Sequence, residues 1–181
     1  MTKLIEGGKL PPFSYDTPFT AGVSIENTVR RVKGKTAVVF LRYYGCTLCQ
    51  YDIHHYANEY DKIMATGGQL LVVLQSAPNK LAGELKEGEL PFDIICDPEQ
   101  KLYKAFEIMP AASMEEMINE KGKEKLWKVK NSGFEHGDYE GEELQLPAVL
   151  VIDSELNINF VNYCQTITEI PETDELALLL G

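Results

Sequence analysis

The chain has 181 residues, of which 44% are hydrophobic and 25% are charged, which predicts one domain with a substantial apolar core. The formal net charge of −11 repels nucleic-acid phosphates and anionic membrane surfaces, so neither is an expected partner. No apolar run approaches the ~20 residues of a membrane span, and residues 1–10 lack the apolar stretch of a signal peptide. We therefore expect a cytoplasmic protein.

Apolar runs alternate with helix-like patterns through the first two thirds of the chain. The runs are rich in β-branched residues, and glycine or proline turns separate them from stretches with three- and four-residue periodicity. Such alternation predicts parallel strands with helices on both faces of the sheet. The expected elements are a strand at 13–16, a helix at 24–32, a strand at 36–41, a helix at 51–64, a strand at 69–74, a helix at 79–86, a strand at 92–96 and a helix that begins at Pro98.

The last third of the chain begins with a segment of different character. Residues 110–143 combine a short helical pattern, a lysine-rich stretch and a glycine-containing loop, and we interpret them as an insertion into the domain. We expect its acidic residues Glu140, Glu142 and Glu143 to lie in a solvated loop. Two apolar runs at 148–152 and 158–163 then predict an antiparallel hairpin, which a helix at 172–180 follows.

Two cysteines mark the turn between the strand at 36–41 and the helix after it. Cys46 and Cys49 are separated by Thr47 and Leu48, a C-x-x-C spacing that is typical of redox pairs next to a βα unit. The free N–H groups and dipole of the first helical turn stabilise a thiolate, and they lower cysteine pKa values from about 8.5 to between about 3.5 and 7.5. We expect Cys46, nearer the helix start and the solvent, to attack and Cys49 to resolve the product, although the reverse order stays open.

Plainer interpretations of the cysteines and their neighbours also stand. The pair is alternatively two buried core thiols or half of a zinc site, but the chain has no second C-x-x-C or C-x-x-H, so no metal is expected. Cys96 and Cys164 are expected to be small core residues. Asp52 and Glu59 are expected to lie on a solvated helix face.

Pro147 stands directly before the strand at 148–152, where a proline does not interrupt the hydrogen bonds of a sheet. With a strand–CxxC–helix unit upstream and a hairpin downstream, it has the place of the cis-proline of thioredoxin folds. We therefore predict a cis Leu146–Pro147 bond. The bond would set the Leu146 backbone beside the sulfurs, where an extended substrate can dock.

Three stretches of the chain carry a resemblance to a known family. Residues 40–49 resemble the F-L-R-x-x-G-C-x-x-C motif of peroxiredoxin-like proteins, residues 91–98 resemble the strand and turn that follow, and residues 145–153 resemble Q-L-x-x-V-x-V-I-D. Together they indicate the thioredoxin-like superfamily and its AhpC/TSA peroxiredoxin-like branch. The resemblance implies an α/β fold for residues 1–181, with a mixed central sheet flanked by helices on both faces.

The chain departs from true peroxiredoxins in its central motif. Their P-x-x-x-T-x-x-C pattern would put proline at Arg42, threonine at Cys46 and the peroxidatic cysteine at Cys49. These enzymes also use an arginine from a later strand, and this chain has none after Arg42. Arg42 is the candidate substitute. The departures favour dithiol–disulfide exchange over efficient peroxide reduction.

The resemblance implies a thiol-dependent oxidoreductase without a cofactor. Its substrates would be disulfides or hydroperoxides, a thioredoxin- or glutathione-type thiol would regenerate it, and a homodimer is an expected assembly. The alternative is a non-catalytic redox-sensing or binding module. The residues expected to bind substrate around the cysteine pair are Tyr44, Gly45, Thr47, Leu146 and Pro147.

Overall fold

The apolar run that precedes the two cysteines forms the middle strand of a five-stranded sheet in the computed structural model, which describes residues 1–181. This strand, β3 (Thr36–Phe40), pairs in parallel with β4 (Gln69–Leu74), which pairs in parallel with β5 (Asp93–Cys96). Every residue of β3 and β4 is buried, as in parallel strands that are covered on both faces. The strands predicted at 36–41, 69–74 and 92–96 are therefore confirmed.

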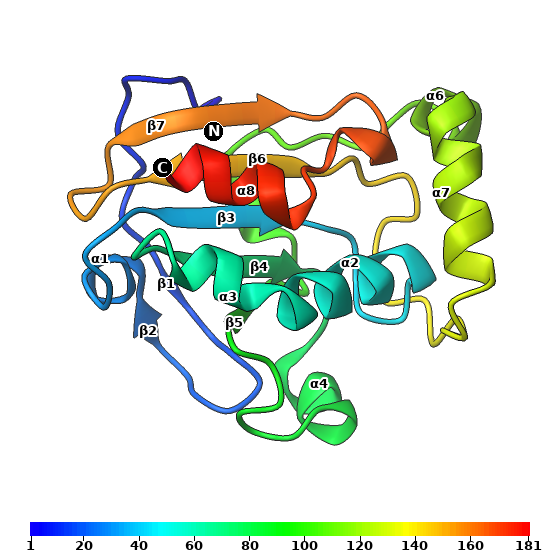
Figure 1. Ribbon diagram of the computed structural model, residues 1–181, viewed down its shortest axis with the longest axis horizontal. Helices are drawn as coiled ribbons and strands as arrows, with labels where there is room; N and C mark the ends of the chain where they lie inside the picture. Colours follow the sequence, from blue (N-terminus) through cyan, green and yellow to red (C-terminus); the bar gives the residue numbers. More distant parts are fainter.

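The predicted hairpin completes the sheet on the other side of β3. There β6 (Ala148–Ile152) runs antiparallel to β3 and turns back into β7 (Ile158–Tyr163). Asp153 stabilises the turn by accepting hydrogen bonds from the backbone N–H groups of Glu155 and Asn157, both at 2.9 Å. The order β5-β4-β3-β6-β7 is a mixed sheet with helices on both faces, which confirms the predicted thioredoxin-like class (Figure 1).

One face of the sheet carries the apolar layer that supports the cysteines. Ala37 and Val39 of β3 belong to this layer, together with Ile53 and the two cysteines themselves. The helices that cover this face are α2 (Thr47–Asn58), α3 (Tyr60–Met64) and α8 (Thr173–Leu180). The first residue of α2 is thus fixed at the end of the sheet by the burial of one face of the helix.

The opposite face carries a second layer, which contains Val38 and Phe40 of β3. It is covered by α1 (Ile25–Val29), α5 (Lys101–Ala105) and the N-terminal segment. Within it the Tyr103 hydroxyl donates to the carbonyl of Leu41 at 2.6 Å and to that of Val73 at 3.0 Å. These bonds tie the ends of β3 and β4 together just before the cysteine turn.

The single helix predicted at 51–64 is two helices, and the first of them begins earlier than predicted. Cys46 is in the extended region, so α2 starts at Thr47 and contains Cys49 in its first turn. At Glu59 the backbone leaves the helical region, with φ of −112° and ψ of 18°, and α3 follows. The apolar periodicity runs on because both helices bury residues against one layer, and it therefore does not reveal the break.

The smaller elements match the expected order with shifted ends. The expected strand at 13–16 is β1 (Ser14–Tyr15), paired antiparallel with β2 (Val23–Ser24). The helix expected at 79–86 is α4 (Pro78–Glu84). The helix expected at 24–32 is shorter than predicted, because α1 covers only Ile25–Val29. The helix expected from Pro98 begins at Lys101, because Gln100 is left-handed with φ of 56° and the Asp97 carboxylate caps the next two N–H groups.

The segment interpreted as an insertion stands at the end of the sheet where β3 and β4 finish (Figure 1). It contains α6 (Met114–Met117) and α7 (Glu120–Lys130), and α7 lies beside α2. Residues 134–143, named the covering segment below, then return toward the cysteine turn. A short 3-10 helix, η1 (Ile167–Glu169), packs against α7 before α8 begins.

Candidate active site

Cys46 caps the N-terminus of α2 with its sulfur. Its backbone is extended, with φ of −71° and ψ of 124°, and its Sγ accepts from the Cys49 N–H at 3.5 Å. A helix start leaves such N–H groups without intrahelical partners, and here one of them is directed at sulfur. Both side chains are free thiols. The predicted turn between strand and helix is confirmed.

Arg42 supplies a fixed positive charge beside this sulfur. Its Nη2 lies 2.9 Å from Cys46 Sγ, and its Nη1 donates to the backbone carbonyl of Glu143 and lies 3.7 Å from the Glu143 carboxylate. The Arg42 side chain is only 14% exposed, so water screens this charge weakly. The arginine singled out from the sequence thus reaches the thiol, held by a residue 101 positions further along the chain.

The two thiols have opposite protonation tendencies. The pKa of Cys46 is lowered to about 6, because the Cys49 thiol donates to its sulfur and Arg42 stabilises its negative charge, against the effect of burial. The pKa of Cys49 is raised well above its ordinary value, first by burial and then by the neighbouring Cys46 sulfur. The pair therefore favours the negative charge on Cys46 and the neutral thiol on Cys49.

The expectation that Cys46 is exposed to solvent is wrong. Cys46 is 1% exposed and Cys49 is 4% exposed. The covering segment closes over them: the Gly45 N–H donates to Glu140 Oε2 at 2.9 Å, and the Gly137 N–H donates to the Gly45 carbonyl at 2.8 Å. A Cβ on Gly45 would overlap the Asp138 carbonyl oxygen, so this close approach depends on glycine.

The acidic loop is therefore part of the site, and its predicted place in solvent is a second correction. Besides the contact of Glu140 with Gly45, the Tyr43 hydroxyl donates to Glu143 Oε1. Burial first, and this hydrogen bond second, raise the pKa of Tyr43. The Glu142 N–H donates to the buried Gln75 side chain at 2.7 Å. The carboxylates of Glu140 and Glu143 thus anchor this loop to the cysteine turn, and the Glu142 backbone anchors it to Gln75.

Asp52 also differs from its expected place on a solvated helix face. It is 8% exposed and forms an ion pair with Lys125 of α7 at 2.8 Å, and Lys125 is buried to a similar extent. Burial raises the pKa of Asp52, and Lys125 opposes this shift. Glu59, the other residue of that expected face, is half-buried and pairs with Lys62 and His55.

A small cavity of about 20 Å³ lies beside Cys49, room for about one water molecule. Arg42, Asp52 and Pro147 line it too. The full lining is Leu41, Arg42, Leu48, Cys49, Asp52, Lys125, Gln145, Pro147, Ile167 and Ile170. Of the residues singled out from sequence, Cys49, Arg42 and Pro147 therefore meet at this cavity, and Cys46 contacts Arg42 without lining it.

The Leu146–Pro147 peptide is trans, so the predicted cis bond is wrong. The trans form is the ordinary preference of an X–Pro bond, by about 0.5–1 kcal/mol. In this form the Pro147 carbonyl extends the sheet by accepting from the Cys164 N–H at 3.1 Å, and the Leu146 carbonyl accepts from the Gln145 side chain at 3.0 Å. Pro147 still lines the cavity beside Cys49.

None of the other candidates, Tyr44, Gly45, Thr47 and Leu146, lines the cavity. Thr47 is the first residue of α2. Tyr44 is buried, with its N–H donating to Ser76 at 2.9 Å and its hydroxyl 3.2 Å from His54 Nε2. These contacts make Tyr44 part of the wall of the site. Cys96 and Cys164 are buried elsewhere, and burial raises the pKa of each to about 12.

Sequence reasoning missed Lys125, Gln145 and the carboxylates of the covering segment. Each lies more than 70 positions from the cysteines, and nothing in the local pattern signals such a contact. Gly137 and Gly141 were the available signal of a close approach. A Cβ on Gly137 would meet the backbone of Gly45, and a Cβ on Gly141 would meet the side chain of Gln75. A loop with regularly spaced glycines thus marked a close approach.

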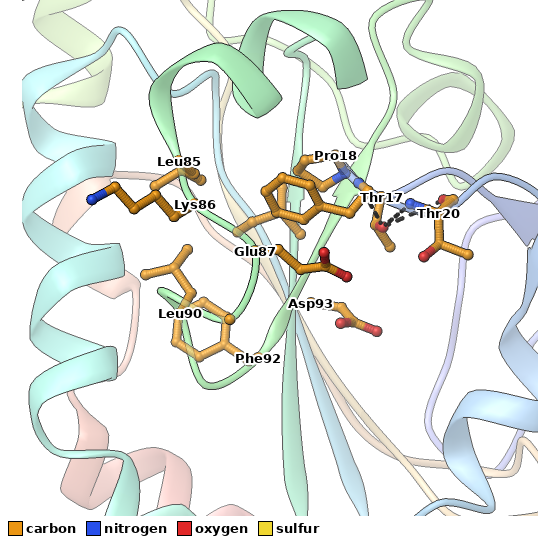
Figure 2. Close-up of a pocket in the computed structure, with 12 residues that line it drawn as sticks. Thr17, Pro18, Thr20, Leu85, Lys86, Glu87, Leu90, Phe92 and Asp93 are labelled. Atoms are coloured by element: carbon orange, nitrogen blue, oxygen red, sulfur yellow. Dashed lines mark hydrogen bonds between the residues drawn. The ribbon is translucent and has the colours of Figure 1, made fainter.

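A larger pocket of about 170 Å³ lies elsewhere, between the loop at 17–20 and the segment at 85–94 (Figure 2). Thr17, Phe19 and Lys86 are among its residues, and no cysteine lines it. No group of three or more His, Cys, Asp or Glu side chains is arranged to hold a metal ion. No helix has both the length and the apolar character of a membrane span.

A thiolate beside an arginine, with a second thiol one helical turn away on a thioredoxin-like sheet, defines a thiol-dependent oxidoreductase of the peroxiredoxin-like class. The sequence matches the AhpC/TSA family over residues 7–161, and the chain belongs to that family. No curated protein sequence matches it significantly.

Solved structures share the fold at low sequence identity. Peroxidoxin BcpB from Mycobacterium tuberculosis aligns with a TM-score of 0.67 and 10% identity over 99% of this chain and 97% of its own. The reduced 2-Cys peroxiredoxin of Plasmodium vivax gives 0.66 and 12%, over 96% and 79%. A putative thiol:disulfide interchange protein, DsbE from Chlorobium tepidum, gives 0.56 and 14%, over 88% and 86%. These likenesses identify the peroxiredoxin-type thioredoxin fold.

Proposed function

We propose that the protein reduces small hydroperoxides with Cys46 as the nucleophile. The observation that carries this proposal is the Arg42 guanidinium, 2.9 Å from Cys46 Sγ. A guanidinium there stabilises the thiolate, and it can also stabilise negative charge on the leaving oxygen of a hydroperoxide. The thiolate, rather than the thiol, is the reactive form of cysteine.

Hydroperoxide reduction then takes three steps: oxidation of Cys46, resolution by Cys49, and regeneration by an external thiol. The Cys46 thiolate attacks the terminal hydroperoxide oxygen and the O–O bond breaks, so that Cys46 becomes a sulfenic acid; the leaving oxygen takes up a proton from solvent and departs as alcohol or water. Cys49 attacks this sulfur and releases water, which leaves a Cys46–Cys49 disulfide. A thioredoxin- or glutathione-type thiol supplies two electrons and restores both thiols.

The closed site favours a small substrate. With Cys46 1% exposed and the covering segment hydrogen-bonded to Gly45, a disulfide on another folded protein could not approach the sulfur in this conformation. Hydrogen peroxide is little larger than the water molecule for which the cavity lined by Arg42 and Cys49 has room, and Arg42 also contacts the Cys46 sulfur. Cys46 is the cysteine that attacks first in this proposal, because its pKa is lowered whereas that of Cys49 is raised.

Thiol–disulfide exchange is the second candidate, supported by the C-x-x-C pair at a helix start and the DsbE-like neighbour. In that reaction the covering segment would have to lift to admit the partner disulfide. A redox sensor is the third, and it would oxidise once without turnover. The cytoplasmic location and the homodimer expected from the sequence remain predictions, which cell fractionation and light scattering test.

Separate Cys46→Ser and Cys49→Ser variants test the proposal. Peroxide consumption with a regenerating thiol should be lost in Cys46→Ser, and Cys49→Ser should accumulate a sulfenic acid on Cys46 that dimedone traps for mass spectrometry. A variant in which Cys96 and Cys164 are both serine is the control and should keep full activity. Sulfenic acid on Cys49 in the Cys46→Ser protein would overturn the assignment of Cys46 as nucleophile.

A further inference from the structure

The resolving step needs a proton acceptor that the thiols themselves do not supply. Cys49 is held as a neutral thiol by burial, yet it attacks the oxidised Cys46 only as its proton leaves. Once Cys46 is a sulfenic acid, it no longer carries the thiolate charge that could take this proton. Another group beside Cys49 must do so.

Asp52 is the only carboxylate that lines the cavity beside Cys49. It follows Cys49 by three positions on α2, so the two side chains lie on one face of the helix, about 5–6 Å apart at Cβ. The two other ionisable residues of the lining, Arg42 and Lys125, are cations and accept no proton. The cavity has room for about one water, which can bridge a thiol and a carboxylate across that distance.

The Asp52–Lys125 ion pair opposes the effect of burial and so favours the charged form of this carboxylate. The 2.8 Å contact joins α2 to α7, and the two side chains are 10% and 12% exposed. Without Lys125, burial would favour the neutral acid, which could not act as a base. The charged or titratable groups around Asp52 are Cys49, His55 and Tyr56 of α2, Arg42 of the preceding turn, Lys125 of α7 and Glu172 at the start of α8.

We propose that Asp52 accepts the proton of Cys49 when Cys49 attacks the sulfenic acid on Cys46, with Lys125 as its positioning residue. The Cys49 S–H bond breaks as the S–S bond forms, and Asp52 becomes a carboxylic acid. The S–O bond of Cys46 breaks, and Asp52 passes the proton to the leaving oxygen, which departs as water. Asp52 ends the step as a carboxylate. This inference rests on the proposed function.

The test follows the sulfenic acid in time. The reduced protein is mixed with one equivalent of hydrogen peroxide, quenched with dimedone at intervals, and analysed by mass spectrometry. Asp52→Asn should form sulfenic acid at the wild-type rate and resolve it about 10²–10⁴-fold more slowly at pH 7, the range of general base catalysis. Resolution by this variant should quicken about tenfold per pH unit, because only pre-formed thiolate then attacks. Wild type should show a flat profile at neutral pH.

Lys125→Gln supplies a second readout that holds if Asp52→Asn folds poorly. Removing the cation favours protonated Asp52, so the pH at which resolution becomes fast should move upward while sulfenic acid formation is unchanged. Asp93→Asn, in the exposed ion pair with Arg31, is the matched control and should leave both steps unaffected.

The outcomes separate this inference from the proposed function. Wild-type resolution rates with a flat pH profile in Asp52→Asn, or an unmoved profile in Lys125→Gln, would overturn the role of Asp52 while leaving the peroxidase assignment in place. Wild-type protein that forms no sulfenic acid on Cys46 would overturn both. Slow, pH-dependent resolution with normal sulfenic acid formation would establish the role.

Discussion

Whereas apolar side chains on two faces fix the strands, hydrogen bonds and ion pairs hold the covering segment over Cys46. The middle strand buries all five of its residues, and its position does not depend on any one polar contact. The covering segment instead depends on single contacts such as Glu140 with Gly45 and Asp138 with Lys80. The fold and the closed site can therefore be perturbed separately.

The largest expected effect is on the core. Phe40→Ala removes a fully buried ring that packs edge-on against Tyr103, at 5.3 Å between centroids, and against Phe106. Loss of the buried ring and the cavity left behind should lower the free energy of unfolding by about 3–5 kcal/mol in urea titrations. Trp127→Ala on α7, 68% exposed, is the control and should change it by less than about 0.5 kcal/mol. Equal losses of unfolding free energy in the two variants would show that α7 contributes as much to stability as the core of the sheet.

The next effect is on the chemistry of the site, with little effect on the fold. Arg42→Met removes the cation beside Cys46, so the pKa of Cys46 should rise from about 6 toward the ordinary value of about 8.5. The thiolate would then be lost as pH falls below that higher value, and the midpoint of the alkylation rate against pH should move upward. Arg31→Met, in the exposed pair with Asp93, is the control. An unmoved midpoint would contradict the role given to Arg42.

A smaller effect is expected where the two regions touch. Gly45→Ala places a Cβ against the Asp138 carbonyl, so the covering segment should shift away and Cys46 should react faster with iodoacetamide. Overpacking of this kind costs about 1–3 kcal/mol in stability. Gly83→Ala within α4 meets no atom within 4 Å and should leave the alkylation rate unchanged. Slower alkylation in Gly45→Ala would mean that the segment does not limit access.

The smallest effect concerns the outer anchor of the covering segment. Lys80→Met removes the ion pair with Asp138, whose side chain is 83% exposed. Exposed pairs contribute little and are screened by salt. Cys46 alkylation should therefore quicken only slightly, and the difference from wild type should vanish in ~1 M salt. A difference that persists in high salt would show that the anchor acts through packing.

The elements of the sheet could be predicted because each strand is an apolar run of neighbouring residues. The apolar runs of β3 and β4 have no polar residue inside them, and glycines mark the turns that follow β3 and precede β4. The cysteine turn followed, since a strand before the pair and a helix after it are both local signals. The break at Glu59 escaped because the apolar periodicity on either side of it is continuous.

The contacts of the covering segment could not be predicted in the same way. Glu140 and Glu143 lie about 100 positions from the residues that they hold, and an acidic loop is ordinarily solvated. Asp52 occupies a helix position that would face water if α7 were absent, and only the tertiary partner Lys125 makes its burial tolerable. The trans bond at Pro147 was missed because superfamily precedent favoured the rarer isomer.

The Gly137 N–H, bonded to the Gly45 carbonyl at 2.8 Å, gives the closed site a built-in reporter. This one bond crosses from the covering segment to the cysteine turn, so deuterium can replace that amide proton only when the two separate. The protection factor at a single backbone position would measure the free energy of that separation directly. It could be followed in thiol and disulfide forms alike, with no attached probe and no substitution.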